Sequence, residues 1–254
     1  MGAVVLQKQF ESLLGGHLGW QAKPVAETVP SGVEEIDLAA GGLPRGCLTE
    51  IVGASSSGRA SLLVSILAKA TARQEFCALV DAEDSFEPHS AAAAGVDLPR
   101  LLWVRCGHSA EHALRASDLL LEGGGFGVVA LDLGDTPARN ARRISLTSWF
   151  RLRRAVEHTP TVLIAVERQS NAGTSASLVL ELSRERAHWT GGAPECARLF
   201  GGMRTAIVIG GRRRQGLTPL SVRCKDLALV IGDRQHCPRG AKSAPWDSGV
   251  SPQE

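Results

Sequence analysis

The chain has 254 residues, of which 44% are hydrophobic and 21% are charged, and its formal net charge is +2 at neutral pH. This composition is typical of a globular protein and excludes a largely disordered one, and the length suits one large domain or two small ones. No apolar run reaches the roughly 18 residues of a membrane span, and no basic region precedes an apolar one at the N-terminus, so we expect a cytoplasmic protein without a secretory signal.

The first segment with a clear pattern is a short amphipathic helix near the N-terminus. Large apolar residues recur at i, i+4, i+7 and i+8 and share one helical face: Leu6, Phe10, Leu13 and Leu14. The pattern ends at Gly15-Gly16, and we expect residues 1–28 to form this helix and a linker ahead of a core domain at 29–232. The apolar face either packs on its own domain or associates with a partner or a second copy of the chain.

A glycine-rich stretch follows at 53–61. It comes after the apolar, strand-like run 47–52 and opens a helix-like run at about 59–73. This strand, turn and helix order is typical of a phosphate-binding loop, because backbone N–H groups converge there and the helix dipole attracts an anion. The expected phosphate-binding residues are Gly53, Ser55, Ser56, Ser57, Gly58, Arg59, Ala60 and Ser61.

This loop departs from the pattern G-x-x-x-x-G-K-[ST] at two positions. Arg59 stands where a lysine would reach the β- and γ-phosphates, and Ala60 stands where a hydroxyl would hold Mg²⁺. Ser61 comes one residue late. The sequence therefore predicts weak binding of ATP, ADP or phosphate at most, and negligible hydrolysis.

Strands and helices alternate through the next part of the chain. Strands are expected at 76–80, 101–104, 128–132 and 162–166, and helices at about 88–94, 109–122 and 138–158. Such alternation predicts an α/β fold, with a mainly parallel sheet and helices on both faces. Further short runs at 177–182, 206–209, 220–222 and 227–231 predict antiparallel strands that extend the sheet, and residues 233–254 have the composition of a disordered tail.

One face of the expected long helix is basic. At 100° per residue, its arginines lie within or beside a sector of about 120°: Arg139, Arg142, Arg143, Arg151, Arg153 and Arg154. No Asp or Glu interrupts them, and Leu146 and Phe150 lie among them. This face is either a solvated surface, a contact to the DNA backbone or a protein-docking face. A later turn adds a second basic cluster, Arg212, Arg213 and Arg214.

Four blocks of residues between about 29 and 231 resemble the RecA-type recombinase core. They are Gly41-Gly-Leu-Pro-x-Gly46, Glu50-Ile-x-Gly-x-x-Ser-Ser-Gly58, Ala78-x-x-Asp-Ala-Glu83 and Ala94-Gly-Val-Asp97-x-x-x-Leu101-Leu. The resemblance implies a three-layer RecA-like core. The run at 172–182, Ala-Gly-Thr-Ser-Ala-Ser-Leu-Val-Leu-Glu-Leu, and the loop ending Gly-Arg-x-Ser are similar to the ImuA branch, the catalytically degenerate RecA-like proteins of bacterial mutagenesis cassettes.

The resemblance also implies roles for single residues. Glu83 matches the glutamate that activates the attacking water, and Asp132 matches the Walker B carboxylate that supports Mg²⁺. Each is either in that role or a solvated carboxylate at a strand end. The family's polar pair after the fifth strand is not recognisable, because Glu167 and Arg168 stand there, and Arg168 joins the candidates for DNA or partner binding.

In function, the resemblance implies a non-catalytic adaptor of error-prone translesion synthesis in the SOS response to DNA damage, associated with the nucleoid. Its implied partners are a degenerate Y-family polymerase-like protein, a C-family error-prone polymerase, DNA and RecA. Two alternatives stay open. One is a DNA-dependent ATPase that tolerates Arg59, and the other is an inhibitor that caps a filament.

Overall fold

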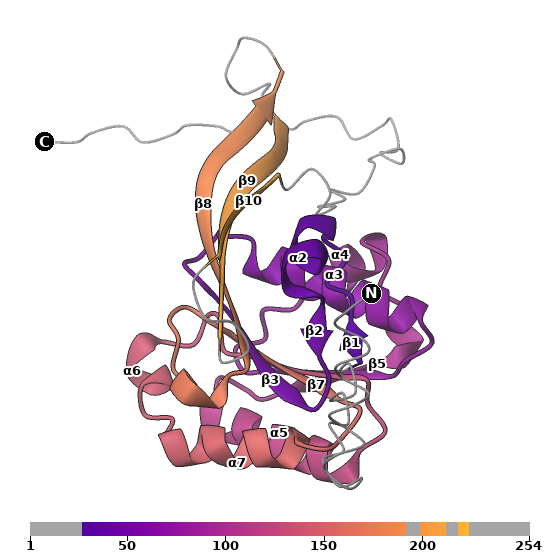
Figure 1. The fold of residues 1–254 in the computed structure, drawn as a ribbon, viewed down its shortest axis with the longest axis vertical. Helices are drawn as coiled ribbons and strands as arrows, with labels where there is room; N and C mark the ends of the chain where they lie inside the picture. Colours follow the sequence, from indigo (N-terminus) through magenta and orange to yellow (C-terminus); the bar gives the residue numbers. More distant parts are fainter. Residues whose placement is uncertain (1–26, 192–198, 212–217, 224–254) are drawn as a thin grey trace, which may run out of the picture.

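An eight-stranded sheet forms the centre of the computed structural model (Figure 1), which describes residues 27–191, 199–211 and, for the backbone alone, 218–223. The spatial order is β10-β9-β8-β3-β7-β6-β4-β5. These strands are β3 (Cys47–Gly53), β4 (Cys77–Asp81), β5 (Leu101–Arg105), β6 (Val128–Asp132), β7 (Val162–Glu167), β8 (Leu178–Thr190), β9 (Leu199–Gly210) and β10 (Thr218–Arg223). A small separate sheet pairs β1 (Thr28–Val29) with β2 (Leu43–Pro44).

The strand directions confirm the predicted α/β class with a mainly parallel sheet. The six strands from β8 to β5 run parallel, and β9 and β10 extend them antiparallel. The strand expected at 177–182 is antiparallel to β9, but on its other side it pairs parallel to β3, so β8 still belongs to the parallel part of the sheet. The loop after β7 returns across the sheet, and the Ser177 N–H donates to the Leu48 carbonyl at 2.8 Å, which starts β8 beside the first residues of β3.

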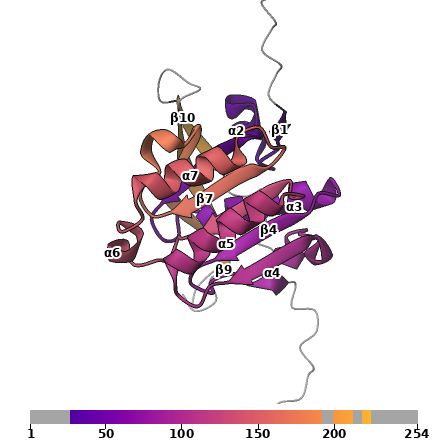
Figure 2. The ribbon, with the colours of Figure 1, turned by 90° about the horizontal axis from the view of Figure 1, so that it is seen from below.

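Helices cover both faces of the sheet (Figure 2). One face carries α2 (Glu34–Ala40), α3 (Arg59–Ala72) and α4 (Pro88–Ala93), and the other carries α5 (Ala110–Gly123) and α7 (Leu146–Val156). Short helical turns complete the fold at η1 (Leu98–Arg100), α6 (Ala138–Ala141) and η2 (Gly173–Ser175). Successive strand residues face opposite sides, so Ala130 packs toward α3 and Leu131 toward α5 and α7. The chain therefore has one apolar core on each face.

The single helix expected at about 138–158 is wrong, because the chain breaks between α6 and α7. Ser145 has extended backbone angles, φ −72° and ψ 150°, and its hydroxyl accepts the Ser148 N–H at 3.1 Å. Serine forms such N-caps readily and thereby begins a new helix. The arginines at 139–143 therefore do not share one helical face with those at 151–154.

β8 and β9 form a long hairpin that extends beyond the helical layers (Figure 1). Its pairing continues from Val179↔Gly210 to Thr190↔Leu199, well past the predicted runs 177–182 and 206–209. The rings of Trp189 and Phe200 meet edge to face at 5.5 Å near its far end. The sequence showed only the apolar half of this hairpin, because charged and polar residues interrupt the few apolar ones of the outer half, of which Trp189 and Leu199 are exposed.

Several predictions lie outside the described residues. They are the N-terminal helix with Leu6, Phe10, Leu13 and Leu14, most of its linker, the cluster Arg212 to Arg214, the strand at 227–231 and the tail at 233–254. Within the ranges that the structure does describe, none of the helices has the length and apolar character to span a bilayer.

Candidate functional site

The glycine-rich loop joins the end of β3 to the start of α3 in a tightly fixed conformation. A side chain at Gly53 would place its Cβ 2.4 Å from the Leu182 carbonyl oxygen and 2.5 Å from Ser57 Oγ, so only glycine fits. Gly58 precedes α3 with φ 99°, a value that glycine adopts without strain. The Ser57 carbonyl accepts the Thr205 hydroxyl at 3.1 Å, and β9 therefore also holds the loop.

The outer part of the loop is open to solvent. Ser55, Ser56 and Ala60 are exposed, Ser61 is half-buried, and Ser57 and Gly58 are buried. The backbone at the start of α3 is thus accessible to an anion, and the helix dipole adds positive potential there. Phosphate binding by this loop stays a prediction.

Arg59 points away from the loop and into the protein. The residue is 7% exposed, and Nη1 donates to the Gly134 carbonyl at 3.0 Å. Nη2 lies 3.8 Å from the Asp135 carboxylate. Burial lowers the pKa of Arg59, while Asp132 and Asp135 raise it. An arginine guanidinium is not deprotonated in proteins, so Arg59 keeps its positive charge.

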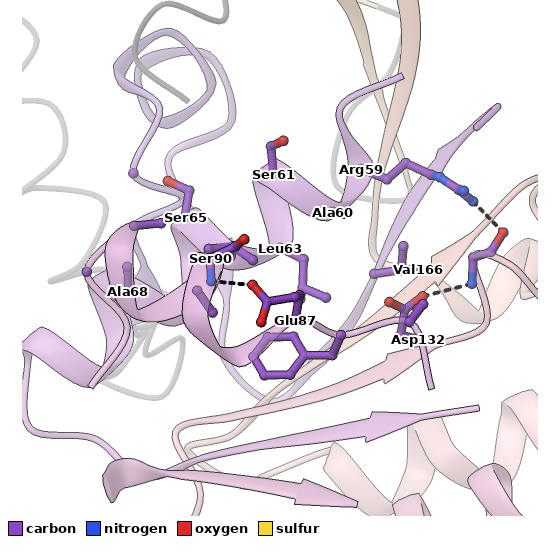
Figure 3. Close-up of a pocket in the computed structure, with 18 of the residues that line it drawn as sticks. Arg59, Ala60, Ser61, Leu63, Ser65, Ala68, Glu87, Ser90, Asp132 and Val166 are labelled. Carbon is purple, nitrogen blue, oxygen red and sulfur yellow. Dashed lines mark hydrogen bonds between the residues drawn. The ribbon is translucent and has the colours of Figure 1, made fainter. Parts of the chain in front are cut away.

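Asp132 ends β6 beside this guanidinium (Figure 3). Its Oδ1 accepts the Gly134 N–H at 2.8 Å. Burial raises the pKa of Asp132 to about 6, and Asp81 adds to the rise, whereas the Gly134 hydrogen bond and the Arg59 charge oppose it. The carboxylate is therefore engaged by the protein's own groups.

Arg168, which the sequence placed among the DNA or partner contacts, lies at the same site. Its Nε donates to the Gly134 carbonyl at 3.1 Å, and its Nη2 lies 3.7 Å from Asp135. Sequence reasoning missed Gly134 and Asp135, and it missed Thr205 on β9. Gly134 and Asp135 follow a strand that ends in a carboxylate, a position where polar loop residues gather, but nothing in their types marks them as partners of Arg59.

The residues beside Asp132 do not fit the Mg²⁺ that a RecA-type core implies. Ala60 supplies no hydroxyl ligand, Asp132 already accepts from Gly134, and the Arg59 cation borders the carboxylate. Over the described part of the chain, no group of three or more His, Cys, Asp or Glu residues is arranged to hold a metal ion.

Glu83 lies in a different environment from Asp132. Its Oε2 is 3.0 Å from His108 Nδ1, and it is not among the residues that line the cavity beside the loop. The turn that carries it is fixed by Asp81, whose carboxylate accepts the N–H groups of Glu83, Ser85 and Phe86. The role in activating water that the resemblance implies for Glu83 stays a prediction.

A cavity of about 690 Å³ lies between α3, α4 and the end of β6 (Figure 3). Its charged groups lie at several places along the walls: Arg59, Asp132 and Asp135 near the end of β6, Lys69 on α3, and Glu87, which caps α4 by accepting the His89 and Ser90 N–H groups. Elsewhere the walls are mostly small residues of the two helices, among them Ala60, Ser61, Ser65, Ala68, Ala91 and Ala94.

The expected basic stripe divides into two groups. Arg151 pairs with Asp118 of α5, and Arg153 pairs with Glu157 at 3.0 Å, so both charges are partly neutralised. The others are exposed and form no ion pair with any residue that the structure describes: Arg139, Arg142, Arg143 and Arg154. Leu146 and Phe150, 58% and 41% exposed, lie on the same helix as Arg154.

Comparison with known proteins gives consistent matches. A family model described as the RecA N-terminal domain matches residues 4–138. Protein RecA of Brucella anthropi is 40% identical over 108 residues, which are 42% of this chain and 30% of that protein. Protein RecA of Symbiobacterium thermophilum is 36% identical over 135 residues, 52% of this chain and 38% of that protein. The chain thus spans about a third of the length of the curated relatives that it matches.

Proposed function

Because this chain belongs to the RecA N-terminal domain family, we propose that it is a RecA-like accessory protein of the DNA-damage response that does not hydrolyse ATP. It acts as an adaptor in error-prone translesion synthesis, and the fold serves as a set of binding surfaces. An adaptor of this kind acts on DNA, so the proposal includes a location in the cytoplasm, at the nucleoid.

The proposal rests on one observation. The charged side chains of the nucleotide site interact with other groups of the protein instead of facing a ligand. The Arg59 guanidinium is bound to Gly134 and Asp135, so it does not point along the loop as a phosphate-binding lysine would. Phosphoryl transfer depends on positioned charge, and loss of one such group typically costs about 10²–10³ in rate. With the hydroxyl at position 60 also lost, little catalysis is expected.

The finer assignment is to the ImuA branch, on the run at 172–182 and the Gly-Arg-x-Ser loop ending. It implies a degenerate Y-family polymerase-like protein and a C-family error-prone polymerase as partners, together with DNA and RecA. The exposed arginines of the α6–α7 region, with Leu146 and Phe150 beside them, support a binding role for that surface.

The test is steady-state phosphate release by the purified chain, with and without single-stranded DNA. We expect no release above background, and no change in the Glu83→Gln variant, because Glu83 lies with His108 outside the cavity. The double variant Arg59→Lys, Ala60→Thr measures how much of the lost activity the loop alone accounts for. Robust DNA-dependent turnover by the unmodified chain, abolished by Glu83→Gln, would favour the ATPase alternative.

A second experiment separates the adaptor from an inhibitor that caps a filament. Co-expression with a degenerate Y-family polymerase-like protein should yield a stable complex at micromolar concentrations. An inhibitor would instead shorten RecA filaments at substoichiometric amounts and form no complex with the polymerase-like protein.

A further inference from the structure

Two arginines from distant parts of the sequence converge on one backbone turn. Arg59, at the start of α3, and Arg168, after β7, donate to the same Gly134 carbonyl at 3.0 and 3.1 Å. Both also lie within 4 Å of the Asp135 carboxylate, at 3.8 and 3.7 Å. These interactions join the ends of β6 and β7 to the first turn of the loop helix.

The same turn brings Arg59 beside Asp132. Gly134 donates its N–H to Asp132 and accepts from Arg59 through its carbonyl. A methyl group at Gly134 would lie 3.0 Å from Asp132 Oδ1 and 3.1 Å from Arg59 Nη1. The Asp132 carboxylate and the Arg59 guanidinium therefore lie on either side of the same small space beside Gly134. Figure 3 shows both hydrogen bonds and the cavity side of Asp132.

The charges of this cluster already balance. Two carboxylates, Asp132 and Asp135, face two guanidinium groups, Arg59 and Arg168. A divalent cation placed against Asp132 would add two positive charges next to a buried guanidinium. The further carboxylate whose charge reaches Asp132, that of Asp81 on β4, already accepts three backbone N–H groups and the Trp103 indole N–H. Like charges at such distances repel strongly where water is largely excluded.

We propose that Arg59 is a tethered cation that takes the place of a metal ion beside Asp132, and that this site therefore binds no divalent cation. The inference rests on the proposed function, since it concerns the same non-catalytic loop, and it names what replaces the metal. The turn and the loop are held together by side chains, so their arrangement does not depend on a bound nucleotide or metal.

The test uses the full chain and Mn²⁺ alone, with free Mn²⁺ followed by electron paramagnetic resonance. The unmodified chain should leave the Mn²⁺ signal unchanged at equimolar concentrations, and its melting temperature should be the same in EDTA and in millimolar Mg²⁺. Arg59→Gln removes the charge but keeps a donor for Gly134, so it should bind Mn²⁺ at least tenfold more tightly. Adding Asp132→Asn to this variant should abolish the added affinity.

The matched control is Arg153→Gln, which removes an arginine paired with Glu157 on α7 and should leave Mn²⁺ binding unchanged. If Arg59→Gln fails to fold, Arg59→Met, which fills similar volume, replaces it. A folded Arg59 variant that shows no added Mn²⁺ binding would overturn the proposal, as would stoichiometric, Asp132-dependent binding by the unmodified chain. Either result leaves the hydrolysis test untouched, because a chain that binds Mn²⁺ can still fail to turn over ATP.

Discussion

Glu50 and Glu167 share one hydrogen-bond donor, the backbone N–H of Asn171, which lies 3.1 Å from a carboxylate oxygen of each. They lie on the neighbouring strands β3 and β7, and both are buried, at 0% and 1% exposure. Burial and the nearby Glu50 charge raise the pKa of Glu167 to about 8. One of the two carboxyl groups therefore keeps its proton near neutral pH.

This pair predicts a loss of stability as the pH rises. The pKa of Glu167 rises from 4.5 in the unfolded chain to about 8 in the folded one, so the folded state binds more protons between these values. Stability contributed by this group is complete below about pH 4.5 and declines up to about pH 8, by at most about 1.4 kcal/mol per pH unit. Urea unfolding at several pH values measures this slope.

The control for the pH effect is Glu167→Gln, which is neutral at every pH. Asp132 contributes with the same sign, but only between 3.8 and about 6, so the measurement belongs above pH 6. There the slope should disappear in Glu167→Gln and persist in Asp132→Asn. An unchanged slope in Glu167→Gln would show that another group titrates.

Binding to DNA should depend on the arginines without ion-pair partners in the described structure rather than on all six. Replacing Arg143 and Arg154 by Gln removes two exposed charges. The slope of the logarithm of the DNA association constant against the logarithm of the salt concentration is about −0.9 for each DNA phosphate that the protein neutralises. The slope should therefore become shallower by about 2 units in fluorescence anisotropy with duplex DNA. The paired residues Arg151 and Arg153, replaced in the same way, serve as the control and should change it little. Equal effects of the two double variants would contradict this division of the surface.

Glycine at position 53 is expected to be irreplaceable. The Cβ of Gly53→Ala would meet the Leu182 carbonyl at 2.4 Å, and backbone atoms cannot move aside cheaply. Overpacking of this kind costs about 1–3 kcal/mol. Gly123→Ala is the opposite case, since no atom lies within 4 Å of its new methyl group, and helix propensity should make it stabilising by about 0.5–1 kcal/mol. Chemical unfolding of the two variants and of the unmodified chain measures whether the free energy of unfolding falls in Gly53→Ala and rises in Gly123→Ala.

The N-terminal segment remains a hypothesis about association. Deleting residues 1–20 should lower the assembly state in analytical ultracentrifugation, while the core keeps cooperative unfolding. The double variant Leu6→Asp, Phe10→Asp tests the apolar face without shortening the chain. If the deletion destroys cooperative unfolding instead, the segment belongs to the core.

The sequence predicted the fold better than the site. Apolar runs determine buried strands, so the bounds of β6 came out as expected, and the helix expected from about 109 is α5, which Ser109 caps. The break before α7 was missed, because helical periodicity continues across Ser145. The pairing of Arg59 with Gly134 could not be predicted, since it joins residues 75 positions apart through a backbone carbonyl that has no sequence signature.

The position of β3 between β7 and β8 has a consequence for synthesis of the chain. Its two neighbours begin at Val162 and Leu178, so a growing chain on the ribosome carries β3 with both edges unpaired until β7 and β8 have emerged. Strand pairings this distant in sequence form slowly, and such edges are targets for chaperones. The hydrogen bond from the Thr205 hydroxyl to the Ser57 carbonyl forms later still, because Thr205 follows both strands in the sequence. The glycine-rich loop therefore reaches its final form only after Thr205 of β9 has been made.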